Sequence, residues 1–144
     1  METIRTISCK LALLPHQKLH IEATMRAFAD ACNFVADYGR KHGKSRQFDL
    51  QHCCYKEVRK RFGLSANLAV RAIARVAPRL LKVKTRNSIF KPTSIDYDAK
   101  IFRVRELDWT VSLTLLCTRE RLALDVGEYQ KKALAGHLST SAVL

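Results

Sequence analysis

Three arginines, Arg71, Arg75 and Arg79, recur at four-residue intervals in a segment with helical apolar periodicity. Residues four apart share one face of an α-helix, so their guanidinium groups would form a single basic row. Guanidinium groups bind phosphate oxygens through paired hydrogen bonds. Bases continue beyond this segment at Lys82, Lys84 and Arg86. The spacing therefore predicts a surface that contacts phosphates.

A solvated helix face is the ordinary alternative for such a row. Acidic residues three or four positions away normally accompany a solvated face, because like charges at that spacing destabilise a helix. The sequence has no acidic residue between Glu57 and Asp96. Phosphate contact is therefore the favoured interpretation.

Charge is unevenly distributed along the 144 residues, which carry 26 Lys+Arg, 13 Asp+Glu and a net charge of +13. Residues 1–39 hold four of each sign and residues 92–144 hold seven of each, whereas residues 40–91 hold fifteen bases and two acids. A neutral frame with one basic segment is typical of a protein that meets a polyanion, nucleic acid above all. The predicted nucleic-acid contacts are Arg40, Lys41, Lys44, Arg46, Lys56, Arg59, Lys60, Arg71, Arg75, Arg79, Lys82, Lys84, Arg86, Lys91, Arg103 and Arg105.

Other residues that could do chemistry form no convincing catalytic or metal site. His16 and His20 have metal-ligand spacing but no third ligand nearby, and Asp96 and Asp98 have the character of turn residues. The run His52-Cys53-Cys54 lacks an orienting acid. The five cysteines show no zinc spacing and are expected to be reduced and mostly buried. We predict no catalytic residue, no metal and no cofactor.

The elements that position these residues follow from apolar periodicity. Alternation over residues 7–13 predicts a strand, and a helix should follow from Pro15 to a cap at Gly39. Residues 40–48 are expected as a basic loop. Asp49 should cap the start of a second helix, which ends at Gly63. Ser65 should cap a third helix, and we expect a kink or a restart of that helix at Pro78.

After Pro92 the apolar period changes from helical to two, which predicts strands around Phe102, Val111 and Leu122. Asp96 to Lys100 should form a turn. We predict an α+β fold: residues 1–14 and 92–130 form a small antiparallel β-barrel, residues 15–91 a basic helical insertion, and residues 131–144 a tail.

Two alternatives concern the helical segment and the apolar sheet face. Residues 56–75 have the pattern of a helix-turn-helix, which would place Asn67 or Arg71 in a DNA major groove. Such a protein would be a small regulator of double-stranded DNA. The sheet face could instead complete a nuclease domain supplied by another chain.

Residues 10–17 (KLALLPHQ), 31–38 (ACNFVADY), 97–102 (YDAKIF) and 127–130 (GEYQ) together resemble the N-terminal part of TnpB proteins, the transposon-encoded RNA-guided nucleases related to type V CRISPR effectors. The resemblance implies a wedge-type β-barrel interrupted by a helical recognition region that binds guide RNA or an RNA–DNA duplex. It also implies a nuclease domain that follows this region in the family, and we expect this chain to lack it. We therefore expect a non-enzymatic binder of RNA, DNA or both, functional alone, as part of a split nuclease, or as a remnant.

No apolar run approaches the roughly 20 residues that cross a bilayer, and the N-terminal residues lack the pattern of an export signal. A cytoplasmic protein with no membrane partner is expected.

Overall fold

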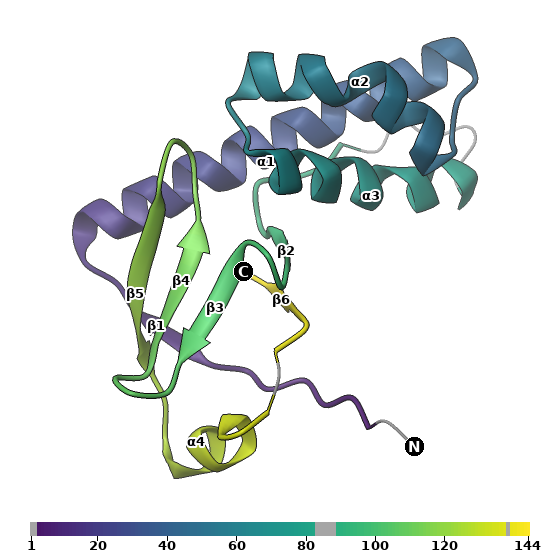
Figure 1. Ribbon diagram of the computed structural model, residues 1–144. Helices are drawn as coiled ribbons and strands as arrows, with labels where there is room; N and C mark the ends of the chain where they lie inside the picture. The colour runs from purple at the N-terminus through teal and green to yellow at the C-terminus, as the bar shows by residue number, and fades with distance from the viewer. Residues whose placement is uncertain (1–2, 83–88, 138) are drawn as a thin grey trace.

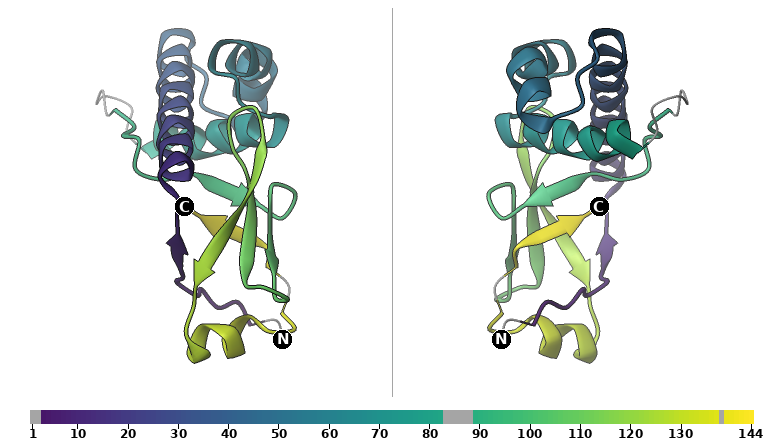
Figure 2. Two further views of the ribbon diagram at one scale, coloured as in Figure 1. Left: turned by 90° about the vertical axis from the view of Figure 1, so that its left-hand side faces the viewer. Right: turned by 90° about the vertical axis from the view of Figure 1, so that its right-hand side faces the viewer.

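The computed structural model describes residues 3–82, 89–137 and 139–144. Three helices lie at one end of the molecule, the strands occupy the middle, and a short fourth helix lies at the far end (Figures 1 and 2). The helices are α1 (Pro15–His42), α2 (Gln47–Phe62), α3 (Ala66–Lys82) and α4 (Glu128–Leu134). The strands are β1 (Lys10–Ala12), β2 (Asp96–Asp98), β3 (Phe102–Arg105), β4 (Thr110–Thr114), β5 (Arg119–Asp125) and β6 (Ser141–Val143).

The α+β class with antiparallel sheets is confirmed. One sheet has the order β1-β5-β4-β3, and a second contains β2 and β6. Lys10 pairs with Asp125, so the N-terminal strand joins a strand from the end of the chain, across the helical insertion. The described strands do not form the predicted closed barrel. β1 and β3 lie at opposite edges of the four-stranded sheet and do not pair with each other.

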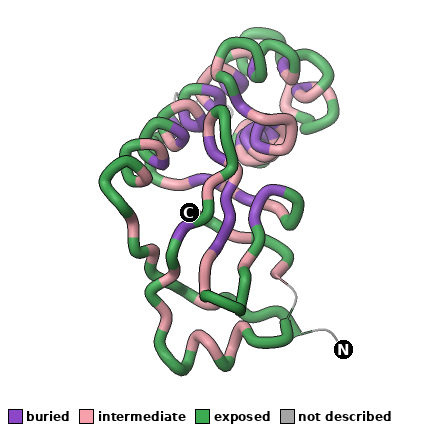
Figure 3. The backbone as a smooth tube through the Cα atoms, turned by 60° about the vertical axis from the view of Figure 1, so that its left-hand side comes forward, coloured by how far each residue is buried: buried purple, intermediate pink, exposed green. Residues whose placement is uncertain are grey.

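A continuous apolar core joins the helical layer to the sheets (Figure 3). Leu50, Cys54 and Val58 of α2 are buried at four-residue spacing, as their periodicity predicts. Ala69, Ala72, Ile73 and Val76 of α3 are buried as well. These inward stripes determine which side chains of each helix face outward.

The ends of the helices differ from the sequence-based predictions. Gly39 is buried inside α1, which ends at His42, and Gly43 with φ +62° is the left-handed cap. The expected loop at residues 40–48 is thus reduced to four residues between two helices. Arg46 occupies the N-cap position of α2, and Asp49 lies in its first turn, where a negative charge suits the helix dipole.

α3 begins after Ser65 but receives no cap from its hydroxyl. The Ser65 carbonyl accepts a hydrogen bond from the Ala69 amide, whereas Ser65 Oγ is buried without a partner among the described residues. The helix continues through Pro78 to Lys82, with no restart. Proline removes one donor only four residues before the helix ends, so little of the hydrogen-bond ladder depends on it.

The segment expected as a tail is partly ordered into secondary structure. Residues 131–134 complete α4, and β6 pairs with β2. Leu144 and Ile95 exchange two backbone hydrogen bonds of 2.9 and 3.3 Å. The end of this chain therefore completes the smaller sheet, directly beside the strand that contacts α3.

Gly39 is required for packing rather than for backbone freedom. A Cβ at this position would lie 2.6 Å from Leu80 Cδ1 and 2.6 Å from the Lys44 carbonyl oxygen, which is backbone and cannot rotate away. We expect Gly39→Ala to lower the free energy of unfolding by about 1–3 kcal/mol, measured by urea denaturation. Gly43→Asn is the control, because asparagine tolerates the left-handed region and nothing lies within 4 Å of the added Cβ. Equal stability of Gly39→Ala and the native protein would contradict this packing.

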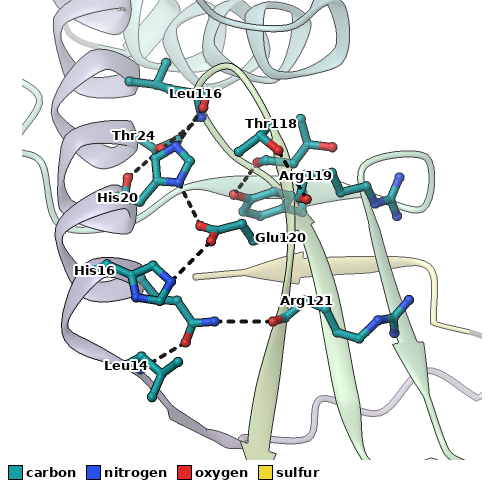
Figure 4. A network of polar contacts seen from close by, with 12 residues as sticks. Leu14, His16, His20, Thr24, Leu116, Thr118, Arg119, Glu120 and Arg121 are labelled. Atoms are coloured by element: carbon teal, nitrogen blue, oxygen red, sulfur yellow. Dashed lines mark hydrogen bonds and ion pairs between the residues drawn. The ribbon is translucent and has the colours of Figure 1, made fainter.

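The β4–β5 hairpin is attached to α1 by a polar network (Figure 4). His20 Nδ1 lies 2.7 Å from Glu120 Oε2, and His20 Nε2 lies 2.6 Å from the Leu116 carbonyl oxygen. The imidazole ring therefore bridges the Glu120 carboxylate and the backbone of the turn between β4 and β5. Buried Thr24 donates to the His20 carbonyl and accepts from the Leu116 amide. The network fixes the hairpin against the first half of α1.

Replacement of His20 by alanine is expected to destabilise the protein by about 1–3 kcal/mol, because two half-buried acceptors lose their donor. His16 is the matched control on the same helix face. It is 69% exposed and its Nε2 lies 3.9 Å from Glu120 Oε1, so His16→Ala should change stability by less than about 0.5 kcal/mol. Thermal unfolding of both variants compares them. Equal losses would show that His20 has no special role.

Candidate nucleic-acid interface

The basic residues of the middle segment fall into two groups with different surroundings. One group lies on α3 and is attached to β2 and the segment before it. The other lies on the outer face of α2 and at its start. Arg71 and Arg75 of the first group contact aspartates, whereas Lys56, Arg59 and Lys60 of the second form no ion pair among the described residues.

Arg75 of α3 is held by several groups at once. Its Nη2 lies 2.8 Å from Asp96 Oδ1, its Nε donates to Asp96 Oδ2 at 2.9 Å, and its Nη1 donates to the Ser94 carbonyl at 3.0 Å. The guanidinium also lies 4.9 Å from the ring centre of buried Phe28. Hydrogen bonding to Asp96 raises the pKa of Arg75. This side chain joins the helical layer to the smaller sheet.

Arg71 and Asn67 face the same strand. Arg71 Nε lies 3.7 Å from Asp98 Oδ2, and Asn67 Nδ2 lies 3.5 Å from Asp98 Oδ1. Asp98 Oδ1 also accepts from the Lys100 amide at 2.9 Å, which stabilises the turn after β2. Asp96 and Asp98, expected as turn residues, thus supply the acidic partners that the sequence neighbourhood of α3 lacks.

Arg79 and Lys91 lie further along the same side of the molecule. The Arg79 guanidinium is 4.5 Å from the centre of the Phe90 ring, and Phe90 is fixed by two hydrogen bonds to Asn33. A shallow hollow of about 460 Å³ is lined by Arg75, Arg79, Lys91 and their neighbours. Arg79 and Lys91 are exposed and stay available to an anion.

The second group is the α2 basic face, which we define as Lys56, Arg59 and Lys60. The buried stripe of α2 turns these three exposed side chains outward. They line a hollow of about 520 Å³ together with Tyr55, Gly63 and Leu64. Within the part of the chain that the structure describes, none of these three side chains has an ion-pair partner. The Arg59 guanidinium lies 5.9 Å from the centre of the Tyr55 ring.

Further bases flank the start of α2. Arg46 is exposed and Lys44 is half-buried, and neither has a side-chain partner among residues 3–82, 89–137 and 139–144. Lys41 pairs with Asp37 at 3.1 Å on the exposed surface of α1, a pair of little energetic weight. Arg40 is exposed in the last turn of α1.

The other predicted contacts lie apart from both groups or outside the described residues. Lys82 is exposed at the end of α3, whereas Lys84 and Arg86 lie outside the described residues. Arg103 is exposed on β3. Arg105 is engaged by Asp108 through two hydrogen bonds, which hold the pKa of that carboxyl well below its usual range.

Sequence reasoning missed the role of the α3 arginines because their partners are 21 and 27 residues away in the chain. It also passed over Arg61, whose guanidinium lies 5.0 Å from the Phe34 ring centre. The alternating Asp96 and Asp98 were the available signal, since alternate residues of a strand share one face.

The cysteines are all unpaired, but only Cys32 and Cys54 are buried, fewer than expected. Burial raises the pKa of Cys32 to about 12 and that of Cys54 to about 11, so neither is a thiolate nucleophile near neutral pH. Cys53 is exposed, and its hydrogen bond to Tyr38 raises the pKa of that phenol. No group of three His, Cys, Asp or Glu side chains in the described ranges is arranged to hold a metal ion.

No protein-family model matches the chain, and no curated protein matches its sequence. Among the described residues, none of the helices combines the length and the apolar character needed to cross a membrane.

Proposed function

We propose that this chain binds nucleic acid through the α2 basic face and the flanking Lys44 and Arg46. The observation that carries the proposal is the set of outward cations around a shallow hollow, none of which forms an ion pair within 4 Å among the described residues. Clustered like charges raise the free energy of the unbound protein, and a phosphate backbone relieves that repulsion. Contacts of this kind position a nucleic acid and do not read its sequence.

The ligand proposed is RNA or an RNA–DNA duplex, as the resemblance to TnpB proteins implies. In this proposal the chain corresponds to the wedge and recognition regions of such a nuclease. The pairing of β1 with β5 across a three-helix insertion supports it, because this is the interrupted sheet that the resemblance implies. The wedge-type barrel would then be represented by the two small antiparallel sheets.

The proposed role is binding rather than catalysis. Cleavage in the TnpB family depends on three carboxylates that hold divalent metal, which the resemblance places in the nuclease domain and not in the region that this chain resembles. A separate chain with a nuclease domain is the partner proposed for cleavage.

The alternative of a DNA-reading helix-turn-helix has less support. Its recognition helix would be α3, yet Asn67 and Arg71 are only partly exposed and contact Asp98 of β2. A major groove would have to displace β2 from that face. The electrostatic mode on α2 needs no rearrangement of the fold.

The test is to measure binding of four ligands of equal length by fluorescence anisotropy in 50 mM salt: single-stranded RNA, structured RNA, an RNA–DNA duplex and double-stranded DNA. We expect micromolar or tighter binding of the RNA-containing ligands, weakening steeply as salt is added. Binding of double-stranded DNA alone, or of no ligand, would overturn the proposal.

A further inference from the structure

α2 carries a row of ring-bearing side chains beside its buried stripe. Phe48, His52 and Tyr55 are separated by four and three positions, the spacing of one helix face. Leu50, Cys54 and Val58 fill the core on the other side. Arg59 of the α2 basic face lies four residues beyond Tyr55, with its guanidinium 5.9 Å from the centre of that ring. We call Phe48, His52 and Tyr55 the α2 ring row.

Exposure along the ring row is greatest at its start, whereas Tyr55 is half-buried and packs in part against the core. Phe48 is 81% exposed and makes no ring contact among the described residues, and His52 is exposed as well. Because Phe48 lies in the first turn of a 16-residue helix, its backbone is held in place while its ring faces solvent. A ring held in this way can stack on a flat partner without any change in the helix.

The charges around the ring row determine what kind of partner fits. Arg46 precedes Phe48, and Lys56 and Lys60 flank the other end of the row. An apolar protein surface would have to remove water from these cations without neutralising them, which is costly. A strand with unpaired bases offers flat π-faces for the rings and phosphates for the cations.

We infer that the α2 ring row stacks unpaired bases of single-stranded nucleic acid, with the strand's phosphates on Arg46 and the α2 basic face. The inference rests on the proposed function and specifies its ligand. In a duplex the bases are already stacked on each other and present mainly their backbones to a helix, so the rings would add nothing to duplex binding. The helical rise places Phe48 and Tyr55 about 10 Å apart along the axis, so that they contact different bases.

The test compares Phe48→Ala with the native chain on 20-nucleotide single-stranded RNA, single-stranded DNA and a duplex of the same length. We expect Phe48→Ala to weaken binding of single strands at least about fivefold, the loss of one base stack, and to leave duplex binding within twofold. Phe48→Trp should retain single-strand binding. Comparison of the affinities for single-stranded RNA and single-stranded DNA shows which strand is preferred.

Tyr129→Ala is the matched control, an aromatic side chain 71% exposed on α4 at the opposite end of the molecule. It should leave all affinities unchanged. Suppose that the native chain binds both single strands and duplex. If Phe48→Ala then has no effect, or weakens binding of both ligands equally, the inference is overturned but the proposed function is not. Failure of the native chain to bind any of the ligands would overturn the proposed function as well.

Discussion

Replacement of Arg75 by alanine is expected to lower the free energy of unfolding by about 2–3 kcal/mol. The Arg75 side chain is only 20% exposed and joins α3 to Asp96 and to the Ser94 carbonyl. Without it, the Asp96 carboxylate stays half-buried with no cation beside it, and the Phe28 ring loses its cover. Denaturant unfolding, followed by circular dichroism, measures the loss.

Two comparisons separate this structural role from phosphate binding. Arg75→Lys keeps the charge but not the forked geometry, so its stability should fall between those of the native protein and the alanine variant. Arg103→Ala, at an exposed and unpaired site of the described sheet, should change stability by less than about 0.5 kcal/mol. If Arg75→Ala were as stable as the native protein yet failed to bind RNA, Arg75 would be a ligand contact and our assignment would be wrong.

Reversal of the α2 basic face, Lys56→Glu with Arg59→Glu and Lys60→Glu, is expected to weaken RNA binding by about a thousandfold at 50 mM salt. Three phosphate contacts are lost and three repulsive charges are introduced. All three side chains are exposed, so the variant should keep its fold. Anisotropy titration measures the affinity, and circular dichroism checks the helix content.

The matched control is the same reversal at Lys100, Lys131 and Lys132, which changes the net charge equally but away from α2. Its affinity should fall no more than about tenfold, through the general loss of positive charge. Equal losses in the two triple variants would indicate binding by overall charge rather than by a defined face.

The sequence predicted well those features that depend on local periodicity. The buried stripes of α2 and α3 follow a 3.6-residue period, which predicted their burial from the sequence. Val111, Leu113 and Leu122 of the strands follow a two-residue period, which predicted theirs. The sequence also predicted that a strand from the end of the chain pairs with β1 in an antiparallel sheet, because a lone N-terminal strand needs a partner.

What could not be predicted depends on contacts between distant parts of the chain. The sequence predicted the cap of α1 at Gly39, but Gly43 is the cap, and the approach of Leu80 and the Lys44 carbonyl explains why Gly39 is buried. Arg75 seemed to lack an acidic partner because only its helix neighbours were considered, whereas Asp96 comes from a strand. The candidate interface thereby moves from the α3 row to α2.

The most direct test of that central claim is the salt dependence of binding to single-stranded RNA, measured for the native chain and for the α2 triple reversal. With about five phosphate contacts through Lys44, Arg46 and the α2 basic face, the logarithm of the native association constant should fall against the logarithm of salt with a slope of about −3.5. The reversal should reduce the slope to about −1.5 or abolish binding. An unchanged slope in the reversed variant would place the phosphate contacts elsewhere and contradict the account.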